Sequence, residues 1–303
     1  MTTRPRAAPR NYFGIEQGRV DRSAEPVYHD VLTTSDLTGC VEIAIRALAP
    51  VHVGCGAFEL RGEQIYKEPA RRGDRLVIPG SSIKGICRQV FEAITASGSP
   101  FDPAEHHQAG RRGGNLSAAA AVFGTLGLQG RVSFDDAGPV ANGKPDAVEA
   151  ESIRLSVAYQ PRKPVGRRFY GPQPTGADQP ARLPALAIPA GTVLLTTLRF
   201  RNLTRPALGG IFSSLGVGRF TPRLGGGKYD DFGWVSFQPT GYRLRRPGLS
   251  GGGSWERDPG AVAAFVADCQ GGLTLDTGGR AALEVLARKL QAPGAGSPGG
   301  RRG

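Results

Sequence analysis

The chain lacks paired cysteines, long apolar runs and enough acids to balance its bases, and each absence excludes a class of protein. Its four cysteines are scattered without a CxxC pair, which excludes a disulfide framework and a zinc finger with paired cysteine ligands; they are Cys40, Cys55, Cys87 and Cys269. No apolar stretch approaches the roughly 18 residues of a membrane-spanning helix. No apolar region of a signal peptide follows the basic start MTTRPRAAPR. We therefore expect a cytoplasmic protein with reduced thiols and no membrane partner.

The shortage of acids leaves a strongly basic chain. Its 303 residues hold 38 lysines and arginines against 26 aspartates and glutamates, for a net charge of +12. This charge indicates a polyanionic partner, most simply a nucleic acid, because neutralised phosphates release counterions and supply affinity that does not depend on sequence. A basic surface that merely aids solubility is the alternative, but the bases are clustered rather than evenly spread.

The stretch VIPGSSIKGICRQVFEAI, residues 77–94, predicts a turn that leads into a helix. Ser81 or Ser82 is expected to cap the first free amides. The apolar residues then follow helical spacing, at Ile83, Ile86, Cys87, Val90, Phe91 and Ile94. Lys84 and Arg88 lie together beside this stripe near the helix start, where free amides favour an anion. The alternative is an ordinary capped core helix with two solvated bases.

A glycine-rich stretch, LGGGKYDDFGWV at residues 224–235, is the second candidate for phosphate binding. It is not a Walker loop, because Pro222 stands where a glycine is required and Tyr229 where Ser or Thr is required. Its backbone amides and bases are expected to lie against a sugar-phosphate backbone, through Arg223, Gly225, Gly226, Gly227 and Lys228. A tight turn that only joins a helix to a strand is the alternative.

Residues 138–189 are rich in proline and have little periodicity, which predicts an insertion outside the core. Bases and aromatic residues alternate there, a combination that suits single-stranded nucleic acid. The bases are Arg154, Arg162, Lys163, Arg167, Arg168 and Arg182, and the aromatic residues are Tyr159, Phe169 and Tyr170. A disordered basic loop is the alternative.

The order of the predicted elements indicates an α+β fold. Strands are predicted at 40–48, 130–134, 190–200 and 232–237, with helices after the first and third of them at 82–94 and 204–215. This βαββαβ order is the ferredoxin-like arrangement that also underlies RNA-recognition modules. Residues 52–67 are expected to form a loop. We expect an N-terminal arm at 1–36, a core at 37–245 and, at 246–303, a linker with two short helices (259–269 and 280–290) and a flexible tail.

Two of these stretches resemble a known family. IPGSSIKGICR, at 78–88, is similar to the IPGSSxKGxxR signature of the RAMP superfamily, the repeat-associated backbone and cap subunits of type III CRISPR effector complexes. LGGGKYDDFGWV resembles the family's glycine-rich loop and FGxV strand, and GRVSFDDA (130–137) and PAGTVL (189–194) match weakly in family order. The resemblance covers about residues 28 to 237.

The resemblance implies a ferredoxin-like fold that binds CRISPR RNA and complementary target RNA beside other type III effector subunits. It also implies a thumb hairpin in place of the basic insertion, with residues 161–172 as its stem or tip. The predicted RNA contacts are Ser81, Ser82, Lys84, Arg88, Arg162, Lys163, Arg167, Arg168, Arg223, Gly225, Gly226, Gly227 and Lys228.

Catalysis is where the sequence departs from the family pattern. Target-cutting members carry an aspartate before the signature helix, and aligning QIYKEP (64–69) places Gly62 at that position with Glu63 beside it. Glycine has no side chain to bind a metal, so we expect a subunit that does not cut and has no cofactor. One alternative is a Mg²⁺-dependent endoribonuclease that uses Glu63, with His52 assisting as a base. Another is a standalone RNA-binding protein with a ferredoxin-like fold.

A zinc site is a further alternative, because some family members carry metal-stabilised insertions. It would use His106, His107 and distant cysteines, but the chain lacks the paired ligand spacing that such sites show.

Overall fold

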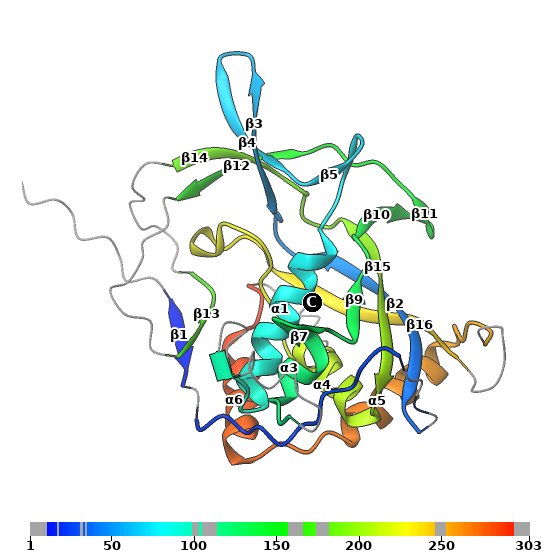
Figure 1. Cartoon of the computed structure of the whole chain (residues 1–303). Coiled ribbons are helices and arrows are strands. Elements are labelled where there is room, and N and C mark those ends of the chain that lie inside the picture. The colour runs from blue at the N-terminus through cyan, green and yellow to red at the C-terminus, as the bar shows by residue number, and fades with distance from the viewer. Residues whose placement is uncertain are drawn as a thin grey trace, which may run out of the picture.

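The structure is a computed structural model that describes residues 11–16, 18–30, 33, 35–98, 103–104, 114–156, 166–173, 182–245 and 253–293. It is a mixed fold in which helices pack on a central antiparallel sheet (Figure 1). The predicted α+β class is confirmed. No helix in the described ranges has both the length and the apolar character needed to cross a membrane.

Strand β2 (Leu37–Ala47) forms the middle of the central sheet. It pairs antiparallel with β15 (Val193–Leu203) on one side and with β16 (Val235–Leu244) on the other. Strand β15 also pairs antiparallel with β9 (Val132–Phe134) and with β10 (Gly138–Ala141), which continues to β11 (Lys144–Pro145). The buried side chains of β2 alternate along the strand, as Val41, Ile43, Ile45 and Ala47. This is the period-two pattern that the sequence predicts for a strand with one buried face.

Helices α1 (Gly80–Ile94) and α4 (Arg205–Ser214) cover the sheet and share one core with it. Thr204 caps α4 by accepting a hydrogen bond from the backbone N–H of Ala207, as its sequence position predicts. The six elements predicted for the core are therefore all present, in the order β2, α1, β9, β15, α4 and β16. A short helix, α3 (Ala118–Phe123), closes one end of this core.

The start of α1 differs from the prediction. Pro79 is the N-cap residue, and neither Ser81 nor Ser82 makes a capping bond. Instead, the N–H of Gly80 donates to Oδ1 of Asp136, 2.8 Å away on the segment after β9. This bond, with the ion pair to Arg72, lowers the pKa of Asp136. The cap therefore comes from a residue distant in sequence, and the serines are left without that role.

A second sheet lies beside the first, in the order β12 (Glu151–Ser156), β14 (Arg182–Ala187), β4 (Gln64–Pro69) and β3 (Gly54–Arg61). The β3–β4 hairpin projects from the molecule (Figure 1). The prediction of a loop at 52–67 is therefore wrong, because most of this segment forms the two strands of the hairpin. Phe58, Leu60 and Ile65 alternate with polar residues around a turn at Gly62, whose φ of +60° suits glycine. Smaller strand pairs are β5 (Arg71–Arg72) with β6 (Arg75–Leu76), and β7 (Gly124–Thr125) with β8 (Leu128–Gln129).

A second core lies on the flank of α1 that faces away from the sheet. There β1 (Tyr12–Ile15) pairs with β13 (Arg167–Tyr170), and Phe13 stacks on Phe169. Helix α6 (Thr277–Lys289) completes this core through Leu283 and Leu286, while α5 (Pro259–Gly271) packs on α4 and β16. Both predicted C-terminal helices are thus present and docked on the body of the molecule.

The described parts of residues 138–189 lie in sheets that pack on the body of the molecule, whereas the sequence predicts an insertion outside the core. Their described strands are shared among three sheets, as β10, β12, β13 and β14. Phe169 is buried in the second core, and Ile188 is buried in the first. The segment shows low periodicity because its strands are short and belong to different sheets. Residues 157–165 and 174–181 lie outside the described ranges.

The packing of α1 gives a test with an internal control. A Cβ on Gly80 would lie 1.9 Å from the carbonyl oxygen of Phe134, whereas a Cβ on Gly85 would meet nothing within 4 Å. Gly80→Ala should therefore lower the melting temperature markedly. Gly85→Ala should stabilise the fold by about 0.5–1 kcal/mol, because alanine is the better helix former. Equal effects in thermal denaturation would contradict this packing.

Candidate nucleic-acid interface

The glycine-rich loop lies directly against the segment that leads into β3. The N–H of Gly226 donates to the carbonyl of His52 at 2.8 Å, and a Cβ on Gly225 would lie 2.3 Å from that same oxygen. Gly225 and Gly227 have φ values of +82° and +72°. Glycine is thus required here for close approach and for backbone conformation. The Gly226 amide, predicted as a phosphate donor, is already used within the protein.

A cavity of about 580 Å³ opens beside this loop, between it and the second sheet. Its polar lining comes from elements far apart in the sequence. The lining residues are His52, Gly54, Lys67, Leu155, Ser156, Tyr170, Leu183, Gly225, Gly226, Gly227, Lys228 and Tyr229. None of these is an acid, so the charged side chains on the wall are the lysines Lys67 and Lys228. The cavity is suited to a negatively charged ligand.

His52 is the most buried ionisable side chain of the lining, with only 4% of its surface exposed. Its Nδ1 lies 2.7 Å from the carbonyl oxygen of Leu186, which can only accept, so Nδ1 carries the proton. Burial lowers the pKa of His52 against the raising effect of this bond, and Lys67 lowers it further. The ring is therefore neutral at pH 7, with an acceptor lone pair on Nε2.

Lys228 begins the 3₁₀ turn η1 (Lys228–Asp230) and is half-buried. Burial, helped by the charge of Arg223, lowers the pKa of Lys228 to about 8. No acceptor for its ammonium is found among the described residues. The two acids that follow nearby are engaged elsewhere: Asp230 accepts hydrogen bonds from Ser156, and Asp231 accepts from Arg223 and Trp234. The Lys228 ammonium is thus free to bind an anion.

Three of the predicted RNA contacts are held inside the protein instead. Arg223 is buried, donates to the carbonyls of Gly171 and Phe232, and stacks on Trp234 at 4.4 Å. Arg88 and Arg167 both pair with the buried carboxylate of Glu92. These arginines connect α1, β13 and the glycine-rich loop. Their bonds stabilise the fold and leave few donors for a ligand.

The other predicted contacts are dispersed. Lys84 is half-buried and has no acceptor among the described residues, and burial and Arg88 lower its pKa, but it does not line the cavity. Ser81 is exposed on the first turn of α1, beside half-buried Ser82. Arg168 lies 5.3 Å over the ring of Tyr12. Arg162 and Lys163 lie outside the described residues.

Gly62 and Glu63 are at the tip of the β3–β4 hairpin, in open space. Nothing comes within 4 Å of a Cβ placed on Gly62. Glu59 of the same hairpin is paired with Arg61 at 2.7 Å, and the described part of the chain contains no group of three His, Cys, Asp or Glu side chains that could hold a metal. The surroundings of Glu63 do not fit a Mg²⁺ site. His106 and His107 are not among the described residues.

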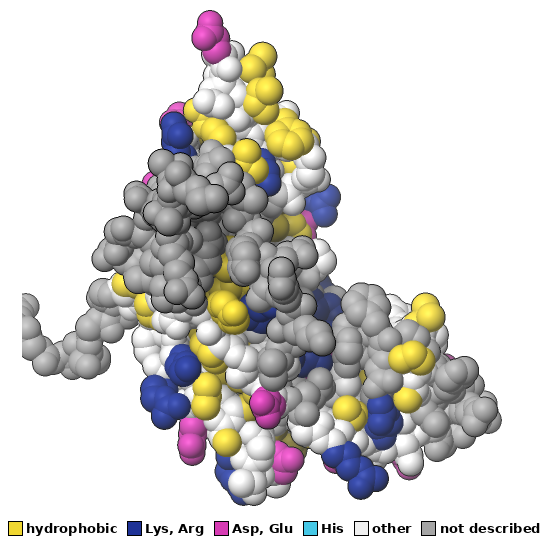
Figure 2. Space-filling model, turned by 90° about the vertical axis from the view of Figure 1, so that its left-hand side faces the viewer, with side chains coloured by type: hydrophobic (Ala, Val, Ile, Leu, Met, Phe, Trp, Pro, Cys, Tyr) yellow, Lys and Arg dark blue, Asp and Glu magenta, His cyan; other side chains and the backbone are white. Residues whose placement is uncertain are grey.

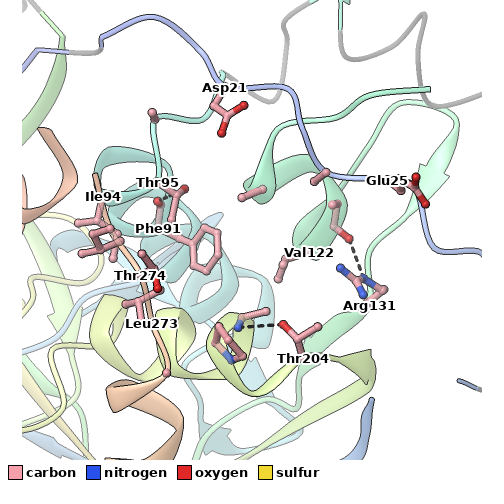
Figure 3. Close-up of a pocket in the computed structure, with 18 of the residues that line it drawn as sticks. Asp21, Glu25, Phe91, Ile94, Thr95, Val122, Arg131, Thr204, Leu273 and Thr274 are labelled. Carbon is pink, nitrogen blue, oxygen red and sulfur yellow. Dashed lines mark hydrogen bonds between the residues drawn. The ribbon is translucent and has the colours of Figure 1, made fainter. Parts of the chain in front are cut away.

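A second cavity, of about 560 Å³, lies between α1, α3, α4 and the segment before α6 (Figure 3). Its floor is apolar, with Phe91, Ile94 and Val122, and its lining includes the carboxylates of Asp21, Glu25, Asp36 and Asp276. The lining base, Arg131, donates to backbone carbonyls of the protein itself. Four acids would repel phosphate, so this cavity does not suit a nucleic acid backbone.

The family is decided by a profile match. The profile described as the RAMP superfamily matches residues 44–228, which is more than half of the chain. The chain belongs to the RAMP superfamily. In this RAMP protein, the matched range includes α1 and every lining residue of the cavity except Tyr229. No curated protein matches the chain. Among solved structures, it is similar to a chain of a "Type IV-B CRISPR Complex", with 19% identity, a TM-score of 0.40, and coverage of 70% of this chain and 92% of that one.

Lys67 is the residue of this RAMP site that the sequence analysis missed, and His52 was considered only as a helper in catalysis. In the sequence, Lys67 is separated from the glycine-rich loop by most of the residues of the core. No local sequence pattern indicates that the two meet. The alternation of residues 58–67 was the available signal, because it places Lys67 and Ile65 on one face of a strand.

The free ammonium of Lys228 makes stability depend on pH. The folded state holds this pKa near 8 against its ordinary value of 10.5, so the unfolded state binds more protons between these values and stability rises with pH there. Lys228→Met should therefore raise the melting temperature at pH 7, and the gain should shrink toward pH 10. Lys144→Met, at an exposed position, is the control. A gain that does not change with pH would contradict the assignment.

Proposed function

We propose that this RAMP protein is a CRISPR RNA-binding subunit of a type III effector ribonucleoprotein. It holds the guide by its sugar-phosphate backbone and leaves the bases free to pair with target RNA. The observation that carries the proposal is the acid-free cavity lined by Lys67, Lys228 and His52 beside the glycine-rich loop. Family membership and the net charge of +12 support it.

The chemistry of the cavity favours the backbone over the bases. Two ammonium groups attract phosphate wherever it occurs along a strand, and such contacts position a nucleic acid without reading its sequence. In a guide-directed complex, base pairing supplies the sequence specificity. The protein would thus bind the guide by charge and shape, while base pairing reads the sequence. The lysines that line the cavity suit this role.

The core that presents this cavity is proposed to be ferredoxin-like. Its strands follow the order β9, β15, β2 and β16 across the sheet, with every neighbouring pair antiparallel. The helices α1 and α4 follow the first and third of these strands in sequence. We keep 37–245 as the extent of the core, 1–36 as an arm and 246–303 as a C-terminal extension.

The proposed partners are CRISPR RNA, complementary target RNA and other type III effector subunits, and the assembly would act in the cytoplasm. The β3–β4 hairpin offers a surface to such partners. Phe58, Leu60 and Ile65 are 57–69% exposed on it, and Figure 2 shows hydrophobic side chains along this projection. Patches of this kind on a projecting element mark interaction sites.

We further propose that this subunit does not cut RNA and needs no cofactor. Glu63 stands at an exposed hairpin tip, and it belongs to no group of three His, Cys, Asp or Glu side chains that could hold a metal among the described residues. A Mg²⁺-dependent endoribonuclease remains the second candidate, since Glu63 lies beside the aligned catalytic position. A standalone RNA-binding protein is the third, and it would purify without other protein subunits.

The binding proposal predicts that Lys67→Gln and Lys228→Gln each weaken binding of single-stranded RNA. The loss should be about tenfold, the value of one charge-assisted contact, for any RNA sequence. Each variant should also reduce the slope of log affinity against log salt by about 0.7. The reason is that each phosphate contact releases counterions on binding, and each variant has one such contact fewer. Fluorescence anisotropy over a salt series measures both quantities.

Lys144→Gln is the matched control, because Lys144 is an exposed lysine on β11, an end strand of the central sheet, and does not line the cavity. If all three variants lost the same affinity, binding would reflect net charge alone. If the Lys67 and Lys228 variants bound RNA like the wild type with an unchanged salt slope, the cavity would not be the RNA site.

For cutting, we predict that a guide-complementary RNA stays intact when incubated with the protein and its guide in Mg²⁺. The gel pattern should be the same in chelator and with Glu63→Ala, because Glu63 belongs to no metal-binding group of three ligands among the described residues. Mg²⁺-dependent cleavage by the wild type that disappears in Glu63→Ala would establish the nuclease alternative.

A further inference from the structure

The Nε2 atom of His52 is an acceptor on a largely buried ring, and no described residue donates to it. The ring is fixed from the other side, where Nδ1–H donates to Leu186, so Nε2 cannot turn away from the cavity without losing this bond. A Cβ on Gly54 would lie only 3.1 Å from Nε2, and a Cβ on Gly226 would lie 3.5 Å from Cδ2 of the same ring. The two glycines therefore leave open the approach to Nε2.

This acceptor lies in a cavity whose charged groups are cations. A ligand that fits must present a hydrogen-bond donor to Nε2 and negative charge to Lys67 and Lys228. A phosphate alone does not satisfy His52, because an ionised phosphate only accepts hydrogen bonds. A ribonucleotide meets both needs, since its 2′-hydroxyl is a donor attached to the sugar between two phosphates.

A donor on a base is the other source of such a bond. Exocyclic amines differ from base to base, whereas every ribonucleotide carries the same hydroxyl close to its phosphate. Lys67 and Lys228 line the same cavity as His52 and are expected to bind phosphate. The group that donates to Nε2 should therefore lie close to a phosphate. The hydroxyl therefore accounts for His52 and the lysines together.

We propose that the cavity beside the glycine-rich loop is a ribose subsite, in which Nε2 of His52 accepts a hydrogen bond from a 2′-hydroxyl and so distinguishes RNA from DNA. The inference rests on the proposed function, because it assigns one residue of that RNA site to one atom of the ligand. His52 acts here in recognition, and no bond is made or broken.

The test compares three oligonucleotides of one sequence: RNA, DNA and RNA with 2′-fluoro in place of every 2′-hydroxyl. The fluoro form retains the sugar pucker and phosphates of RNA and loses only the donor. Wild-type protein should bind RNA about 3- to 10-fold more tightly than 2′-fluoro RNA, the range of one hydrogen bond. A second RNA sequence should give the same ratio. If a base amine donated to Nε2 instead, RNA and 2′-fluoro RNA would bind equally, because both carry the same bases, and this result would overturn the proposal.

Two substitutions test whether His52 causes the preference for RNA over 2′-fluoro RNA. His52→Met retains the bulk of the side chain without the acceptor and should bring the ratio close to one. Gly54→Ala retains His52 but crowds Nε2, and it should lower the ratio in the same direction. Gly138→Ala, on β10 away from the cavity, is the control, because its φ is not left-handed and nothing lies within 4 Å of the added Cβ; it should retain the wild-type ratio. Melting temperatures check that each variant is folded.

The outcomes separate this inference from the function on which it rests. Equal affinity of the wild type for RNA and 2′-fluoro RNA, with tight binding to both, would overturn the ribose subsite and leave the RNA-binding function intact. Absence of binding to any of the three would overturn both. A wild-type preference for RNA that persists in Gly54→Ala and in a folded His52→Met would place the discrimination elsewhere and also overturn the proposal.

Discussion

The close contact between the first turn of α1 and the backbone at the end of β9 is the constraint on which the rest of the structure depends. Only a residue without a side chain fits where Gly80 meets Phe134, and Asp136 then caps the helix from the same segment. With this end fixed, Ile83, Cys87 and Phe91 face the sheet core, while Val90 and Ile94 face the second core. One helix thereby holds two packed regions together.

The buried carboxylate of Glu92 extends this constraint to the proposed RNA site. It pairs with Arg88 of its own helix and with Arg167 of β13, and Gln89 donates to the carbonyl of Arg168. Strand β13 then presents Tyr170, whose hydroxyl lies 3.1 Å from that of Tyr229 on the cavity wall. Removing one partner from such a buried cluster would leave an uncompensated charge. The site is therefore supported by the same helix that organises the core.

Local patterns explain what the sequence could predict. The strand of Val41, Ile43 and Ile45 and the helix of Ile83, Cys87 and Phe91 follow from periods of two and 3.6 residues, which need no knowledge of partners. The roles of the bases could not be predicted in this way. Whether Arg88, Arg167 or Arg223 binds a ligand or an acid of the protein depends on contacts between residues that are mostly far apart in the sequence. The charge pattern of the sequence is the same for either outcome. His52 and Lys67 are brought to the glycine-rich loop by contacts between distant segments: β4 pairs with β14, and His52 is hydrogen-bonded to Leu186 and to Gly226.

The position of β3 has a consequence for the chain outside an assembly. Among the described strands it ends its sheet and pairs with β4 alone, and it carries Phe58 and Leu60 exposed to water. An open edge strand with apolar side chains is a template for β-pairing between molecules, which soluble proteins commonly prevent with a charge or proline. Glu59 and Arg61 neutralise each other there and give little electrostatic repulsion. The isolated chain is thus prone to aggregation through this hairpin at high concentration, and a binding partner that covers the edge would also keep it in solution.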